Sequence, residues 1–169
     1  MSEIQFATRK TPLGEVLVAC RAGGVCAILL GDGPDELISD LQRRFPRAQL
    51  SAADLDDWLA PIGAYLEDPA LGLDLPLVLD GTPFQMQVWQ ALQAVPVGAT
   101  TTYAALAQQI GAPKAVRAVA QACGANRLAL AIPCHRVLRS DGGLSGYRWG
   151  VARKQEILAR EAKACGSRG

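Results

Sequence analysis

The sequence contains one histidine, His135, and its five cysteines include no Cys-x-x-Cys pair. This scarcity argues against a zinc module of the usual spacing, and an odd number of thiols argues against a disulfide scaffold. No Gly-rich phosphate loop or nicotinamide fingerprint occurs either, so we expect no cofactor and no metal. Aromatic residues make up only 5% of the 169 residues, but half of the chain is hydrophobic. That balance supports a folded core and excludes disorder as the main state.

Long hydrophobic runs are also missing. The longest, such as 128–133, fall far short of the roughly 20 apolar residues that a membrane-spanning helix needs. The opening Met1-Ser2-Glu3 lacks the basic segment and apolar stretch of a secretory signal. We therefore expect a cytoplasmic protein that does not bind membranes, and we expect it to be a monomer.

Acidic residues are scarce in the second half of the chain. Residues 1–99 hold 6 Lys and Arg against 13 Asp and Glu, a net charge of −7, whereas residues 100–169 hold 11 against 3, a net charge of +8. The two halves together give the net charge of +1 of the whole chain. Opposite charges can simply attract each other within a fold. A basic half-chain is also typical of a protein that binds a polyanion.

The first half has the pattern of a small α/β domain. Three short β-prone runs with turn sequences between them predict an antiparallel meander. Two helices should follow, the second kinked or divided by Pro61, and alternating leucines then indicate an edge strand because Pro76 cannot donate to a ladder. The predicted strands span 4–8, 14–20, 25–30 and 73–79, and the helices begin at 34 and span 53–67. We place the domain boundary after residue 79.

The second half, 80–169, has the pattern of a mainly helical domain. Helices are predicted over 84–94, 103–110, 114–123 and 151–164. The two short helices joined through Gly111-Ala112-Pro113 match a helix–turn–helix that exposes Lys114, Arg117 and Gln121. An ordinary corner between two helices would give the same pattern, but the basic charge favours nucleic-acid binding.

The run Ile132-Pro133-Cys134-His135-Arg136-Val137 is the most informative stretch. A cysteine reacts as its thiolate, and a nearby imidazole and positive surroundings lower the pKa of the thiol. If the run is extended, neighbouring side chains point to opposite faces, so we expect His135 to reach the Cys134 thiol through a water. A buried structural cysteine is the alternative. We expect the other four cysteines, which have no such neighbours, to be structural.

These segments together resemble the O6-alkylguanine-DNA alkyltransferases, also called methylated-DNA–protein-cysteine methyltransferases. The resemblance covers nearly the whole chain and is strongest from Phe84 to Glu161. It rests on the Cys134 run together with Thr102-Tyr103, Gly111–Val119 and Ala125-Asn126. The segment Leu144–Gly150 is similar to bacterial members, and the chain resembles their standalone form.

The resemblance implies a ribonuclease-H-like α/β domain over 1–79. It implies a mainly helical, winged-helix-like domain with a helix–turn–helix over 80–169. It further implies DNA repair by direct, stoichiometric and irreversible transfer of an alkyl group to Cys134 from O6-alkylguanine, and from O4-alkylthymine. The partner would be double-stranded DNA that contains alkylated bases, with the damaged base flipped out of the duplex.

The same resemblance assigns roles to individual residues. Cys134 would be the alkyl acceptor, His135 its water-linked base, and Glu161 the residue that orients His135. Asn126 would hold the turn beside the acceptor, and Tyr103 would donate a proton toward the guanine. The implied DNA contacts are the finger Arg117, the loop residue Tyr147, and Gln85, Ala104, Ala112 and Ser140. Some members hold zinc in the first domain, but this chain has Cys20 and Cys26 there and no histidine, so we expect no zinc.

Three other functions remain open: a damage-binding protein without transferase activity, a helix–turn–helix regulator with an incidental cysteine, and a cysteine hydrolase. Non-catalytic relatives lack the acceptor cysteine, and this chain has Cys134. Nothing in the sequence indicates the oxyanion site that a hydrolase needs. Transfer of label from alkylated DNA to the protein would separate the first two functions from a repair enzyme.

Overall fold

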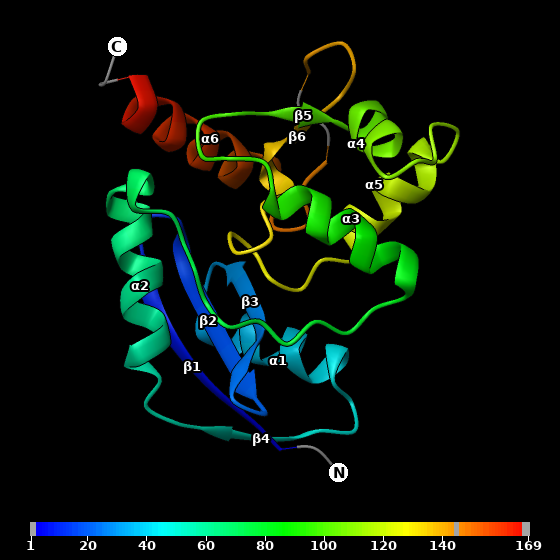
Figure 1. The fold of residues 1–169 in the computed structure, drawn as a ribbon. Helices are drawn as coiled ribbons and strands as arrows, with labels where there is room; N and C mark the ends of the chain where they lie inside the picture. The colour runs from blue at the N-terminus through cyan, green and yellow to red at the C-terminus, as the bar shows by residue number, and fades with distance from the viewer. Residues whose placement is uncertain (1–2, 144–145, 167–169) are drawn as a thin grey trace. The chain divides into compact units, whose positions relative to one another are not determined.

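A four-stranded sheet forms the centre of the first unit, which comprises Met1–Val78 and Arg127–Ala129 (Figure 1). The computed structural model of the chain describes residues 3–143 and 146–166. The predicted antiparallel meander is present, and a fourth strand, which was not predicted, pairs parallel with the first. The strands are β1 (Glu3–Thr11), β2 (Gly14–Arg21), β3 (Gly24–Gly31) and β4 (Gln49–Ala52), in the order β3-β2-β1-β4.

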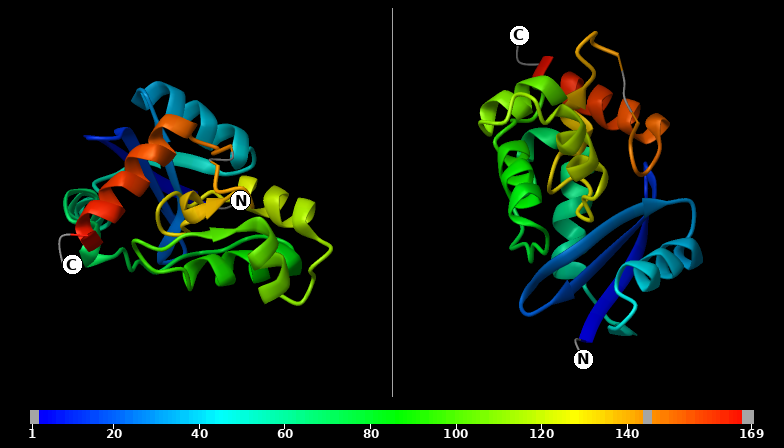
Figure 2. Two further views of the ribbon diagram at one scale, coloured as in Figure 1. Left: turned by 90° about the horizontal axis from the view of Figure 1, so that it is seen from above. Right: turned by 90° about the vertical axis from the view of Figure 1, so that its right-hand side faces the viewer.

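Two helices cover this sheet. Helix α1 (Pro34–Arg44) packs against β2 and β3, and helix α2 (Asp56–Glu67) packs against β1. The chain crosses the sheet in one direction through α1 and returns in the other through α2. Because such crossovers are right-handed, the two helices lie on opposite faces, as Figure 2 shows. Every residue of β3 is consequently buried.

The structure bears on two predictions about prolines. The segment 73–79 forms only an isolated bridge between Leu77 and Val25, in which Val25 N donates to Pro76 O at 2.8 Å, rather than a full edge strand. Pro76 has no amide hydrogen to extend the ladder. In contrast, α2 is not divided at Pro61. Burial of Leu59, Ile62 and Leu66 on one side of α2 offsets the cost of that proline, about 3 kcal/mol.

The second unit comprises Leu79–Asn126 and Leu130–Gly169 and is mainly helical. Helix α3 begins with a capping box, in which Thr82 accepts from Gln85 N at 3.1 Å and Gln85 accepts from Thr82 N at 3.0 Å. Trp89 of α3 donates to Ala122 O of α5 at 2.9 Å, within an apolar core. The helices are α3 (Pro83–Gln93), α4 (Tyr103–Gln109), α5 (Val116–Gly124) and α6 (Val151–Gly166).

Helices α4 and α5 pack together with a short turn between them, as predicted for a helix–turn–helix. Thr102 caps α4 by accepting from Ala105 N at 3.0 Å, and Gly111 takes a φ of +80° in the turn. Just before α4, the two-residue strand β5 (Thr101–Thr102) pairs parallel with β6 (Val137–Leu138). This pairing holds the start of α4 next to the segment that follows Cys134.

Candidate active site

A pocket of about 360 Å³ opens on the second unit beside Cys134. Its walls come from the start of α4, the last turns of α5, the Cys134 segment and the described part of the loop before α6. The lining residues are Tyr103, Ala120, Cys123, Gly124, Cys134, Gly146, Tyr147 and Arg148. The structure therefore brings three predicted residues, Tyr103, Cys134 and Tyr147, to one cavity.

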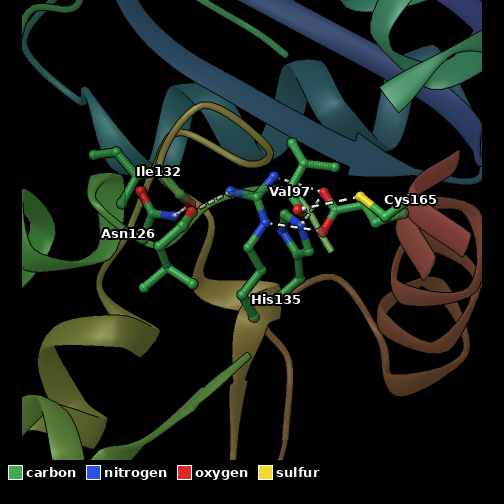
Figure 3. A network of polar contacts seen from close by, with 8 residues as sticks. Val97, Asn126, Ile132, His135 and Cys165 are labelled. Carbon is green, nitrogen blue, oxygen red and sulfur yellow. Dashed lines mark hydrogen bonds and ion pairs between the residues drawn. The ribbon is translucent and has the colours of Figure 1, made fainter. Parts of the chain in front are cut away.

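Cys134 begins a 3₁₀ turn, Cys134–Arg136, so the run is not extended at this point. Its side chain is buried, and Asn126 Nδ2 donates to Cys134 Sγ at 3.3 Å. The same Asn126 nitrogen donates to Ile132 O at 2.9 Å (Figure 3). Burial raises the pKa of the Cys134 thiol to about 11, although the Asn126 bond and the charges of Lys154 and Arg148 lower it. The expectation of a low thiol pKa was wrong, because burial outweighs the basic surroundings.

His135 points away from solvent and contacts Glu161 of α6. His135 Nε2 lies 2.9 Å from Glu161 Oε2, and both side chains are fully or almost fully buried. Burial lowers the pKa of His135, more than its contact with Glu161 raises it, so the ring is neutral at neutral pH. Its other nitrogen, Nδ1, is buried and has no hydrogen-bond partner within the described part of the chain. That nitrogen is available to accept a proton, and the predicted water link to Cys134 stays a prediction.

Arg136 completes this network, and we did not predict its role. Its guanidinium donates from Nε to Glu161 Oε1 at 2.9 Å, from Nη2 to Glu161 Oε2 at 2.7 Å, and from Nη1 to Val95 O at 2.6 Å. Beside this network, at the end of α6, Cys165 Sγ contacts Val97 O at 3.3 Å (Figure 3).

Lys154 is a second residue that the sequence reasoning missed. It is buried, and its Nζ donates to Val137 O at 2.7 Å. Burial lowers the pKa of Lys154, whereas the two thiols Cys134 and Cys123 raise it. The sequence held an indication of the Arg136–Glu161 and Lys154–Val137 contacts. Lys154, Ile157 and Glu161 are spaced three and four residues apart, so they share one face of a helix. Two charged residues on the face of a buried isoleucine indicate polar partners inside the fold.

Cys123 is a second buried thiol in the pocket wall. Burial raises its pKa to about 12, so it is a neutral thiol at neutral pH. Cys20, Cys26 and Cys165 lie elsewhere and are free. In residues 3–143 and 146–166, no three side chains of the His, Cys, Asp and Glu types gather in a way that could hold a metal ion.

The remaining predicted residues lie outside the pocket wall. Arg117 is exposed on α5, and Ser140 is exposed in the segment after β6. Ala104 and Ala112 are half-buried in α4 and in the turn that follows it. Gln85 caps α3, as described above, which gives it a structural role. Leu144 and Ser145 of the bacterial-type loop lie outside the described residues.

The stretch of chain that contains α4 and α5 has no acidic residues. Residues 81–140 contain no Asp or Glu at all, while Lys114 and Arg117 are exposed there. The first acidic residue beyond this stretch, Asp141, is paired with Arg139 at 2.6 Å. Such a stretch attracts an anionic partner.

Comparison with known proteins gives the family of the chain. The profile of the family described as "6-O-methylguanine DNA methyltransferase, DNA binding domain" matches residues 83–163. A methylated-DNA–protein-cysteine methyltransferase of Mycolicibacterium paratuberculosis is 38% identical over 160 residues, covering 95% of this chain and 93% of that protein. The chain belongs to this methyltransferase family.

A longer relative and a solved structure of this methyltransferase family are also similar to the chain. The bifunctional transcriptional activator and DNA repair enzyme Ada of Escherichia coli is 53% identical over 162 residues, which are 95% of this chain and 46% of Ada. The chain thus spans about half the length of that relative. A crystal structure of Mycobacterium tuberculosis OGT in complex with DNA has a TM-score of 0.80 at 30% identity, covering 96% of this chain and 94% of that one. None of the helices in the described parts is long and apolar enough to cross a membrane.

Proposed function

We propose that this chain repairs DNA by transferring an alkyl group from O6-alkylguanine, and from O4-alkylthymine, to Sγ of its own Cys134. It would act as a methylated-DNA–protein-cysteine S-methyltransferase that turns over once. The observation that carries the proposal is the placement of Cys134: the thiol opens on a pocket on one side, and a buried His135–Glu161–Arg136 network follows it directly in the chain. Family membership supplies the reaction class.

The chemistry follows from the protonation states. Cys134 rests as a neutral thiol and His135 as a neutral base, so the thiol proton leaves for His135 Nδ1 as the sulfur attacks. The S–C bond forms while the C–O6 bond breaks, and guanine keeps the bonding electrons. Tyr103, which lines the pocket, donates its phenolic proton to the departing guanine. The proton on His135 then passes through solvent to the Tyr103 phenolate, so that both side chains return to their neutral forms. A thioether is left on Cys134, and no hydrolytic group adjoins it in the described pocket.

We further propose that duplex DNA binds to the second unit and that the damaged base leaves the stack to enter the pocket. The stretch without acidic residues that contains α4 and α5 supports this, with Arg117 as the finger in the vacated stack. Gln85, Ala104, Ala112 and Ser140 would make further contacts, and Tyr147 would cover the base. In this proposal, residues 1–79 form a ribonuclease-H-like domain, and residues 80–169 form a winged-helix-like domain that carries the reaction.

One experiment tests the transfer directly. The protein is incubated with a duplex that carries a single O6-methylguanine, digested with trypsin and mapped by mass spectrometry. Cleavage after Arg127 and Arg136 isolates Cys134 in the peptide 128–136, while Cys123 falls in 118–127. We expect one added methyl group on 128–136, unchanged transfer in Cys123→Ser and no transfer in Cys134→Ala. A methyl group on 118–127, or none on any peptide, would refute the proposal.

A further inference from the structure

The Arg136 guanidinium lies between a backbone carbonyl and one carboxylate. Three of its nitrogens donate, two of them to the two oxygens of Glu161 and one to Val95 O. Both charged groups are buried, so solvent does not screen their attraction. A paired, two-point contact of this kind holds a carboxylate in one orientation more firmly than a single hydrogen bond does. Glu161 is therefore fixed as an ionised carboxylate.

The fixed carboxylate determines which nitrogen of His135 carries the proton. An ionised carboxylate can only accept hydrogen bonds, and Oε2 of Glu161 lies 2.9 Å from His135 Nε2. Nε2 must therefore carry the hydrogen, and the lone pair is left on Nδ1. As described above, Nδ1 is buried and has no partner in the described part of the chain. The ring thus presents its basic nitrogen, and not its N–H, to whatever delivers a proton.

Three charged groups act on the same ring. Glu161 of α6 favours the imidazolium, while Arg136 of the 3₁₀ turn and Lys154 of α6 disfavour it. The Cys134 thiol, next to His135 in the chain, is neutral at neutral pH. If Arg136 were absent, the full charge of Glu161 would act on His135 and favour the protonated ring. A protonated ring cannot accept a proton from a thiol.

We propose that Arg136 is a positioning residue for alkyl transfer: it clamps Glu161 so that His135 keeps its proton on Nε2 and holds Nδ1 open to receive the Cys134 proton. The proposal rests on the proposed function for the source of that proton. Arg136 touches neither the substrate nor the sulfur in this role and acts entirely through Glu161 and His135. The expected signature is a change in the pH dependence of transfer and not only in its rate.

The single histidine of the chain allows a direct test. In the untagged protein, the imidazole signals in an ¹⁵N-resolved NMR titration come from His135 alone. We expect the wild type to show the proton on Nε2 and a titration midpoint below the usual value of about 6.5. Arg136→Met should raise the midpoint by at least about one pH unit, and Arg136→Lys, which keeps the charge but not the two-point contact, should fall between them. Arg160 directly precedes Glu161 and forms a surface ion pair with Glu156. Arg160→Met removes this ion pair and should leave the titration midpoint of His135 unchanged.

Alkyl transfer measured on the same variants gives the second readout. The acidic limb of the pH–rate profile should move upward with the imidazole midpoint, so that Arg136→Met loses about tenfold in rate on that limb and recovers toward alkaline pH. An unmoved midpoint in Arg136→Lys and Arg136→Met, with equal loss at every pH, would overturn the positioning role. If the midpoint moves as expected but the wild type transfers no methyl group, the coupling of Arg136 to His135 through Glu161 is supported, and the proposed function, and with it a role in alkyl transfer, fails.

Discussion

Opposing effects meet at the sulfur of Cys134. Burial disfavours the thiolate, whereas Asn126, Lys154 and Arg148 favour it, and burial prevails with a pKa of about 11. The thiol is consequently protected from small reagents at rest. In the proposed mechanism, the thiol becomes nucleophilic only when a substrate fills the pocket and His135 takes the proton.

This balance predicts the reactivity of the free protein. The rate at which Cys134 reacts with iodoacetamide should rise with pH throughout the range from 7 to 9.5, because the thiolate fraction grows about tenfold per pH unit below the pKa. Lys154→Met, which removes a buried positive charge, should lower the rate further at each pH. Mass mapping of peptide 128–136 follows Cys134 separately from the other thiols. A rate that levels off near pH 7 would contradict the raised pKa.

At the scale of helices and strands, the sequence predicted most of the elements. Periodicity and capping residues gave β1–β3, α1, α3, α4 and α6 to within a few residues, because each of these elements buries a regular apolar face. Strand β4 was missed because its four residues show no alternation and pair only through the backbone. The short pair β5 and β6 was missed for the same reason.

The candidate site was predicted less completely than the elements. The Cys134 motif indicated a reactive or a buried structural cysteine, and the family resemblance supplied the proposed acceptor role and the pairing of His135 with Glu161, a contact that is present at 2.9 Å. The Arg136 and Lys154 contacts were not predicted, because they join residues 17 to 41 positions apart. The helical spacing of Lys154, Ile157 and Glu161 can indicate that the two charged side chains have polar partners, but local pattern does not say which residues these partners are. The thiol pKa depends on burial that only the folded chain creates.

The turn between α4 and α5 gives a prediction at this scale. Gly111 has a φ of +80°, and an added Cβ would meet no atom within 4 Å. Gly111→Ala should therefore destabilise the protein by about 1–2 kcal/mol through backbone strain alone. Gly63→Ala, inside α2 with equally open space and no positive φ, should be stabilising by about 0.5–1 kcal/mol. Chemical denaturation of the two variants measures both changes, and equal effects would show that strain at the turn is negligible.

The exposed Arg117 of helix α5 gives a prediction about DNA repair. If Arg117 replaces lost stacking in the duplex, Arg117→Ala should slow repair of duplex DNA at least about tenfold more than attack on free O6-methylguanine, since unstacking costs a few kcal/mol. Lys114→Ala is the matched control on the same exposed surface. It should weaken DNA binding and reduce its salt dependence by about one unit, without that difference between substrates. Equal losses on both substrates in Arg117→Ala would indicate a folding defect.

At the scale of the whole molecule, we expect alkyl transfer to lower the thermal stability of the protein. Transfer would leave a neutral thioether where Asn126 donated to a buried thiol, and it would add carbon at a residue that is only 6% exposed. Overfilling a packed site costs about 1–3 kcal/mol. For a chain of this length, that corresponds to a melting temperature about 2–12 °C lower. Larger alkyl groups should lower the melting temperature more.

Two measurements on one sample check this prediction. Titration against excess methylated duplex should stop at one alkyl group per protein, because nothing in the described pocket regenerates the thiol. Calorimetry before and after the reaction should then show the lower melting temperature, and Cys134→Ala carried through the same incubation should show none. Conversion beyond one equivalent would rule out a single turnover. An unchanged melting temperature would mean that the 360 Å³ pocket beside Cys134 accommodates the adduct without strain, and the loss of stability would then grow only with groups that exceed it.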